Sequence, residues 1–272
     1  MTPKPPKISR SSKSASHHVD SDAANTVPRP VSAFARTDSA GHLIQPHTHA
    51  RDQLIYAIRG VMTIQTHNSI WTIPSSYSLW IPADVEHSVK MDTGVEMRTL
   101  YFTPGTVAGS PSECQVRAVS PLLRELIIHA MTIPPLYDEN GPDGRLMQVI
   151  VDEICGQQVM PFSLKLPEDR RLAQLCRYLL SSLDESESIR QIGDKVGLSE
   201  RSIIRLFPRE TGMTLHHWRQ QARLMRAFAL AEQGKPLGVI SGELSYSTPS
   251  AFAKMFRKVF GQSPREILVN RS

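Results

Sequence analysis

The C-terminal part of the chain repeats one pattern of apolar residues, and this repeat constrains the fold more than any other feature. From Ser188 to Val196 apolar residues recur at helical spacing, Gly197 interrupts the pattern, and Ser199 is suited to cap a second helix. The pattern returns 48 residues later before the turn and 49 residues later after it. The matched pairs are Ile192 and Ile240, Val196 and Leu244, Ile203 and Phe252, Arg205 and Lys254, Phe207 and Phe256, and Gly212 and Gly261. Two short amphipathic helices around a tight turn form a helix-turn-helix, so the sequence predicts two of them.

The segment between the two copies predicts a long helix. In "TLHHWRQQARLMRAFALAEQG" the residues Leu215, Trp218, Ala222, Met225 and Ala229 fall along one face. A helix of about 19 residues is roughly 28 Å long. Such a rod would hold two recognition helices about one turn of DNA, roughly 34 Å, apart.

Charge is shared unevenly along the chain. Residues 168–272 hold 17 Lys and Arg against 11 Asp and Glu, whereas residues 31–167 hold 9 against 13 and residues 1–30 hold 5 against 2. A basic C-terminal third behind an acidic middle indicates that one end meets a polyanion and the other a different partner. An ordinary solvated helical surface explains the charge alone equally well.

Two stretches of the C-terminal third carry a resemblance to a known family. With "LSERSIIRLFPRETGMT" and "YSTPSAFAKMFRKVFGQSP", residues 168–272 resemble the AraC/XylS family of bacterial transcription regulators. The resemblance implies binding to double-stranded DNA, with base-facing positions at Arg201, Ile204 and Arg205 in the first recognition helix and at Pro249, Ser250 and Lys254 in the second. The arginines can pair with guanine, whereas a lysine is a point charge suited to phosphate.

Four residues depart from the family pattern. Ser245 and Gly242 stand where the family usually has glycine and an apolar or small residue, so the second turn is expected to be looser or strained. Pro208 lies late in the first recognition helix and is expected to bend its last turn. Ile267 replaces the usual aromatic residue near the end. These departures bear more on the sequence specificity of the second copy than on its fold.

Residues 31–104 alternate short β-rich runs with turn residues, a pattern typical of a β-sandwich or barrel. His47 and His49 are two residues apart and therefore point to the same face of a strand. This stretch resembles the cupin barrel. The first cupin motif is matched by Gly41, His47, His49, Gln53 and Gly60, with Gln53 where a glutamate is usual. The second is matched by Pro82 and His87, with Ser76 and Asp84 in place of its glycines.

The cupin resemblance implies a metal-ligand set of His47, His49, Gln53 and His87. Three imidazoles suit Zn, Ni, Cu or Fe(II), and a neutral Gln53 compensates the cation less well than a carboxylate. The alternative is a pocket of hydrogen-bonded histidines that recognises a small effector. Tyr56 and Trp80 are the expected aromatic walls of that effector pocket.

These observations predict an α+β chain with an N-terminal cupin-like β-barrel, linking helices and an all-α C-terminal domain with two helix-turn-helix motifs. The expected boundaries are a disordered tail at 1–30, an effector domain at 31–108, linking and dimerisation helices at 109–160, a linker at 161–167 and the DNA-binding domain at 168–272.

The predicted function is sequence-specific transcriptional regulation in response to a small effector or metal, without enzymatic activity. Two amphipathic segments, 119–133 and 143–156, are expected to pass the state of the barrel to the DNA-binding domain. The resemblance adds a homodimer, RNA polymerase as a further partner and a neighbouring transporter gene as a target. The alternative is a metal-dependent cupin enzyme, a dioxygenase or isomerase, fused to a DNA-binding module. Its acid–base candidate is Glu86, next to His87.

Cysteine use and hydropathy indicate a cytoplasmic protein with no membrane association. The three cysteines form no C-x-x-C pair, which suits reduced thiols. No apolar stretch approaches the roughly 18 residues of a membrane span. The basic N-terminal stretch lacks the apolar core of a secretion signal.

Overall fold

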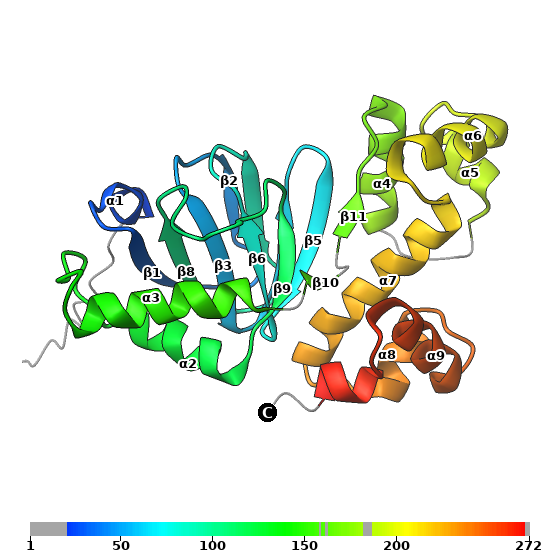
Figure 1. Ribbon diagram of the computed structural model, residues 1–272. Helices are drawn as coiled ribbons and strands as arrows, with labels where there is room; N and C mark the ends of the chain where they lie inside the picture. The colour runs from blue at the N-terminus through cyan, green and yellow to red at the C-terminus, as the bar shows by residue number, and fades with distance from the viewer. Residues whose placement is uncertain (1–20, 158, 161–162, 182–186, 270–272) are drawn as a thin grey trace, which may run out of the picture.

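The computed structural model describes residues 21–157, 159–160, 163–181 and 187–269. An N-terminal sandwich of two antiparallel sheets is followed by a C-terminal set of helices (Figure 1). The predicted α+β class is confirmed. None of the helices within the described ranges has the length and apolar character that crossing a membrane requires.

The sandwich consists of sheet A, with strand order β1-β8-β3-β6-β9-β10, and sheet B, with strand order β11-β5-β4-β7-β2. The strands of sheet A are β1 (Val31–Asp38), β8 (Val95–Phe102), β3 (Asp52–Arg59), β6 (Tyr77–Ile81), β9 (Gln115–Ala118) and β10 (Val159–Met160). Those of sheet B are β11 (Ser163–Lys165), β5 (Ser69–Pro74), β4 (Val61–Gln65), β7 (His87–Met91) and β2 (Leu43–His47).

Sheet A is buried on both faces. In β3, Ile55 and Ala57 belong to the core between the sheets, whereas Leu54 and Tyr56 belong to a second core on the outer face. Helices α2 (Pro121–Ala130) and α3 (Pro142–Cys155) cover that outer face (Figure 1). The predicted linking helices are therefore present, and they pack on the side of sheet A.

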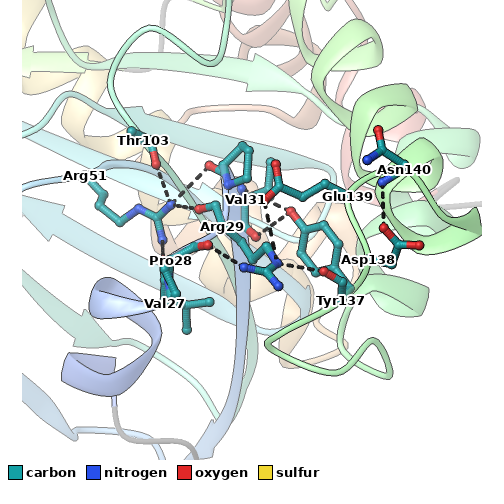
Figure 2. A network of polar contacts seen from close by, with 11 residues as sticks. Val27, Pro28, Arg29, Val31, Arg51, Thr103, Tyr137, Asp138, Glu139 and Asn140 are labelled. Carbon is teal, nitrogen blue, oxygen red and sulfur yellow. Dashed lines mark hydrogen bonds and ion pairs between the residues drawn. The ribbon is translucent and has the colours of Figure 1, made fainter.

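The segment before β1 is fixed to the sandwich by a buried arginine. Arg51 is 5% exposed, and its guanidinium donates to Ser32 Oγ at 2.9 Å and to Thr103 Oγ1 at 2.7 Å. It also donates to the carbonyl oxygens of the residues that lead from helix α1 (Ser21–Thr26) into β1 (Figure 2). The expected disordered tail is thus wrong for residues 21–30, because the chain there satisfies a buried cation. Residues 1–20 of that tail lie outside the described residues.

A second contact joins this segment to the loop between α2 and α3. Arg29 Nε donates to the carbonyl oxygen of Tyr137 at 2.7 Å, and the Tyr137 hydroxyl donates to the carbonyl oxygen of Val31 at 3.0 Å (Figure 2). The Arg29 guanidinium also lies 3.8 Å from a carboxylate oxygen of Glu139. The start of β1 and the helical layer therefore hold each other in place.

The predicted linker at 161–167 contains a strand. Strand β11 pairs with β5 at the edge of sheet B, and Leu166 N donates to the carbonyl oxygen of Asn68 at 2.8 Å. Pro161 belongs to the predicted linker but lies outside the described residues. An extended run beside an open sheet edge adds a strand, because its backbone groups gain partners there. The chain thus enters the C-terminal domain directly from sheet B.

The C-terminal helices follow the predicted duplication. They are α4 (Arg170–Ser181), α5 (Ile189–Asp194), α6 (Glu200–Thr211), α7 (Leu215–Glu232), α8 (Leu237–Glu243), α9 (Pro249–Phe260) and a short π-helical turn, Arg265–Val269. Helices α5 and α6 form the first helix-turn-helix, α8 and α9 form the second, and α7 joins them (Figure 1). Ile267 is buried in this core. Helix α6 continues through Pro208 to Thr211, so the proline does not end it.

Candidate metal centre and nucleic-acid interface

Three histidines from separate parts of the sandwich converge in one group. His47 ends β2, His49 follows it in a loop, and His87 begins β7 opposite His47 in the strand register. Their candidate ligand atoms all lie within 4.8 Å of one another. The predicted trio is therefore brought together by the pairing of β2 with β7.

All three imidazole rings are oriented in the same way. Each Nδ1 lies against the backbone carbonyl oxygen of a residue two positions away, at 2.8 Å for His47, 2.8 Å for His49 and 2.9 Å for His87. A carbonyl oxygen only accepts, so each Nδ1 carries the hydrogen and each neutral ring keeps its lone pair on Nε2. Backbone bonds of this kind are the usual outer support of metal-binding histidines.

His87 is the most buried of the three, with 1% of its surface exposed. Burial is the main cause that lowers the pKa of His87 to about 4, and the neighbouring imidazoles of His47 and His49 lower it further against an opposing hydrogen bond to Val85. The ring is therefore neutral at physiological pH. Within the described part of the chain, its Nε2 has no hydrogen-bond partner. A buried lone pair without a donor is a group that a metal ion would satisfy.

Gln53 completes the predicted ligand set. It is 3% exposed, and its Oε1 lies 2.9 Å from Nε2 of His49. When His49 donates from Nδ1, neither its Nε2 nor Oε1 of Gln53 carries a hydrogen. Two acceptors at this distance repel each other unless both bind the same cation. Without a cation, the Gln53 amide would turn its NH₂ group toward the ring. The donor set of three imidazoles and one amide oxygen fits a divalent transition metal.

Tyr101 is a site residue that the sequence did not reveal. Its ring lies edge-on to His49 with 5.2 Å between ring centroids. In the pairing of β8 with β3, Tyr101 lies opposite Gln53. The alternation along β8 places Tyr101 in the core between the sheets. That alternation is a signal that could have found it.

Tyr56 and Trp80, the expected walls of the effector pocket, lie elsewhere. Both belong to the core under α2 and α3, and Trp80 packs against Phe102 with 5.5 Å between ring centroids. Neighbouring residues of a strand point to opposite faces, so these rings point away from the face that carries Ile55 and Leu79. The expectation that they line the histidine pocket is wrong.

The acid–base candidate of the enzyme hypothesis is not part of the cluster. Glu86 is exposed, and in the described ranges the metal-ligand group consists of the three histidines without a carboxylate. The cluster thus offers ligands rather than a paired acid and base.

The first recognition helix presents its predicted DNA-facing residues to solvent. Helix α6 buries Ile203 and Phe207, and it leaves Arg201, Ile204 and Arg205 exposed on the opposite side. The apolar side chain of Ile204 is 57% exposed, so the described part of the chain leaves it largely uncovered. Ser199 caps the helix by accepting a hydrogen bond from the backbone N–H of Ser202. The exposed face is suited to a major groove.

The second recognition helix is arranged in the same way. Helix α9 begins at Pro249 behind the N-cap Thr248, and it buries Phe252 and Phe256. Its predicted base-facing residues, Pro249, Ser250 and Lys254, are all exposed. Both helices therefore offer a free outer face.

Comparisons with known proteins agree with this two-part organisation. Residues 29–200 match the family described as "AraC-like ligand binding domain", and residues 192–269 match "Helix-turn-helix domain". The chain is 31% identical over 233 residues to the HTH-type transcriptional regulator NimR of Escherichia coli strain K12, covering 85% of each chain. It is 24% identical over 224 residues to the probable transcriptional regulator LumQ of Photobacterium leiognathi, covering 80% of this chain and 89% of that one.

Among solved structures, ToxT from Vibrio cholerae is 10% identical to this chain, with a TM-score of 0.38, over 88% of this chain and 98% of that chain.

Proposed function

The chain belongs to the AraC family of transcriptional regulators, with a ligand-binding domain and a helix-turn-helix DNA-binding domain, and on this basis we propose that a metal held by the histidine cluster controls its binding to specific DNA. The observation that carries this proposal is the convergence of three Nε2 lone pairs, one of them buried and without a partner in the described chain. His47, His49, His87 and Gln53 would hold the ion. When bound, a divalent transition metal supplies a position where an oxygen or nitrogen atom of an effector can attach.

The protein residues around the cluster set its properties. The backbone carbonyls that accept from each Nδ1 fix the rings and direct the lone pairs inward. Tyr101 closes one side of His49. The half-buried position of His47 leaves one side of the cluster open to an incoming small molecule.

DNA recognition is assigned to the exposed faces of α6 and α9. Arg201 and Arg205 carry planar guanidinium groups that can pair with two acceptors of one guanine, and each such contact discriminates by about 1–3 kcal/mol. Lys254 would bind phosphate, while Ile204, Pro249 and Ser250 contact base edges by shape. The exposure of all six side chains supports this assignment.

A DNase footprint on the DNA upstream of the protein's own gene tests the proposal. The footprint is compared between protein as isolated, protein after chelation, and chelated protein supplied again with Zn, Ni, Cu or Fe(II). The control is protein taken through the same dialysis without chelator. A footprint that changes on chelation and returns with one metal supports the proposal, and an unchanged footprint contradicts metal control.

We further propose that the protein is a homodimer that pairs through the layer of α2 and α3. Leu122 and Val149 on these helices are 54% and 43% exposed, although the opposite faces are buried against sheet A. Exposed apolar residues on neighbouring helices are suited to a partner surface. Light scattering on Leu122→Asp and Val149→Asp variants tests this, and a dimer that persists in both contradicts it.

The remaining proposals concern the cellular setting. We propose that the protein acts in the cytoplasm without catalytic turnover, that it contacts RNA polymerase, and that its targets include a neighbouring transporter gene. Reduced, unpaired cysteines and a DNA target support this setting. Transcript levels of the neighbouring gene in a deletion strain test the target assignment.

A further inference from the structure

Helix α7 is the element of the DNA-binding domain that meets the ligand-binding domain. It packs against β4, β5 and β11 of sheet B, the same sheet that carries His47 and His87 (Figure 1). The helix and the sheet together line an open pocket of about 440 Å³ between the domains. Helix α7 joins the two helix-turn-helix motifs. Its packing against sheet B therefore sets the orientation of both recognition helices relative to the sandwich.

Among the described residues, α7 forms a hydrogen bond to the other domain near each of its ends. Near its start, Trp218 Nε1 donates to the carbonyl oxygen of Lys165 in β11 at 2.9 Å. At its last residue, Oε1 of Glu232 accepts from the backbone N–H of Gly60 at 3.1 Å. Trp218 is fully buried in the hydrophobic core, whereas Glu232 is only half-buried. The contact at Glu232 is therefore the one that can open without unpacking the core.

The backbone fixes the direction of the Gly60 N–H. Gly60 has a φ of 94°, and a Cβ at this position would lie 2.2 Å from the carbonyl oxygen of Gly94. Only glycine fits such a turn, because other residues would be strained and would collide. The donor thus keeps its direction whether or not Glu232 is present.

One strand connects this donor to the histidine cluster. Strand β3 begins beside Gln53, which contacts His49, and it ends at Arg59, directly before Gly60. Seven residues of strand cover about 23 Å. The side chains from Asp52 to Ala57 are buried, so a shift at Gln53 is passed along this part of the strand rather than absorbed by a loose side chain. Between Ala57 and Arg59 the register with β8 is irregular, and the backbone carries the shift from there to Gly60.

We infer that the hydrogen bond between Glu232 and Gly60 is a latch between the domains, and that the state of the histidine cluster sets its occupancy through β3. The latch holds α7, and with it both recognition helices, in one orientation relative to the sandwich. This inference rests on the proposed function, because metal binding is what changes the state of the histidine cluster. The contact between Glu232 and Gly60 is the structural change that would follow.

The first test compares DNA affinity with and without chelation. In the wild type, chelation is expected to change the DNA dissociation constant by a factor of about 5 or more. In Glu232→Ala this factor falls below about 2, because the two domains no longer bias each other. Glu232→Gln retains an oxygen acceptor and keeps part of the response. The matched control is Glu243→Ala, which removes a carboxylate that pairs with Lys235 inside the DNA-binding domain, at 2.6 Å.

The second test measures the hydrogen bond between Glu232 and Gly60 directly, and it does not depend on a response to metal. Hydrogen exchange of the Gly60 amide is expected to rise about tenfold in Glu232→Ala and to stay near the wild-type rate in Glu232→Gln and Glu243→Ala. The amides of residues 54–57 in β3 serve as the internal reference, since they should not change.

The outcomes separate the two ideas. If chelation leaves the DNA dissociation constant of the wild type unchanged, the proposed metal control is wrong, and so is the control of the latch by the histidine cluster. If Gly60 exchanges equally in the wild type and Glu232→Ala, or if Glu232→Ala responds to chelation as strongly as the wild type, the latch is overturned.

Discussion

Ser245 has the same left-handed backbone conformation as Gly197, its counterpart 48 residues earlier, with φ of 59° against 68°. Each residue makes the turn between the two helices of its helix-turn-helix. The strain expected at the second turn is therefore located at one residue. Glycine adopts this conformation freely, whereas a side chain with a Cβ raises its free energy by roughly 1–2 kcal/mol.

The first prediction follows from this relationship. Ser245→Gly should raise the free energy of unfolding by about 1 kcal/mol, a rise in melting temperature of roughly 2–4 °C. The serine side chain is exposed, so little packing is lost. The reciprocal variant, Gly197→Ser, should lower the melting temperature by a similar amount. Thermal unfolding followed by circular dichroism checks both, and a Ser245→Gly protein that melts earlier than wild type would disprove the assignment of strain.

The second prediction concerns the first recognition helix. Arg205→Ala should abolish the specific footprint, because a guanidinium that pairs with guanine contributes about 1–3 kcal/mol of discrimination. The side chain is exposed, so the fold should survive. Arg177→Ala, which removes an exposed arginine on α4, outside both recognition helices and the proposed dimer surface, is the control and should keep the footprint. A wild-type footprint from the Arg205 variant contradicts the assignment.

The third prediction separates sensing from DNA binding. His47→Ala should leave the DNA contacts of the metal-free protein intact and remove its response to metal. His47 lies at the end of β2 in the sandwich, whereas the predicted DNA-facing residues lie on α6 and α9. Gel-shift titrations with chelated protein check the first half, and the same titrations with added metal check the second. Loss of DNA binding by a folded, metal-free His47 variant contradicts the separation.

The fourth prediction uses the amide in the cluster. Gln53→Glu should bind a divalent metal at least tenfold more tightly, because a carboxylate compensates the cation. Without metal, the variant should melt earlier than wild type, since its carboxylate is placed at a position that is 3% exposed. Competition with a coloured chelator measures the affinity, and melting with and without metal measures the stability. Equal metal affinity of variant and wild type would remove Gln53 from the ligand set.

The fifth prediction concerns the thiols. Burial raises the pKa of Cys114 to about 12, and burial also raises the pKa of Cys176 far above its usual range. Both thiols therefore stay protonated and unreactive at pH 8, whereas Cys155 is exposed. A thiol reagent should modify one cysteine per native chain, and Cys155→Ser should reduce this to none. Rapid modification of a second cysteine in the native protein contradicts this order.

Local patterns predicted the helical part of the molecule and its turns. The recurrence of Ile203 and Phe207 as Phe252 and Phe256 indicated two recognition helices, because helix periodicity alone marks which residues turn inward. Asp84 stands where the second cupin motif has glycine, and its φ is 62°, so the backbone requirement persists although the residue has changed. Its N–H donates to the carbonyl oxygen of His49 at 2.9 Å, which ties this turn to the histidine loop.

By itself, then, the sequence determined the duplicated helix-turn-helix and the closeness of His47 and His49, because these follow from short spacings along the chain, although His49 lies in the loop after β2 and not on the strand. Only the tertiary structure decided which side of sheet A each residue of β3 faces. Residues 52–57 are all buried, and a strand with apolar side chains on both faces does not encode which face is covered by helices and which by another sheet. For the same reason Tyr56 lies in the core under α2 and α3 instead of in the expected pocket. The bond between Glu232 and Gly60 joins residues 172 positions apart, and no local pattern specifies such a contact, because it depends on how two folded domains pack.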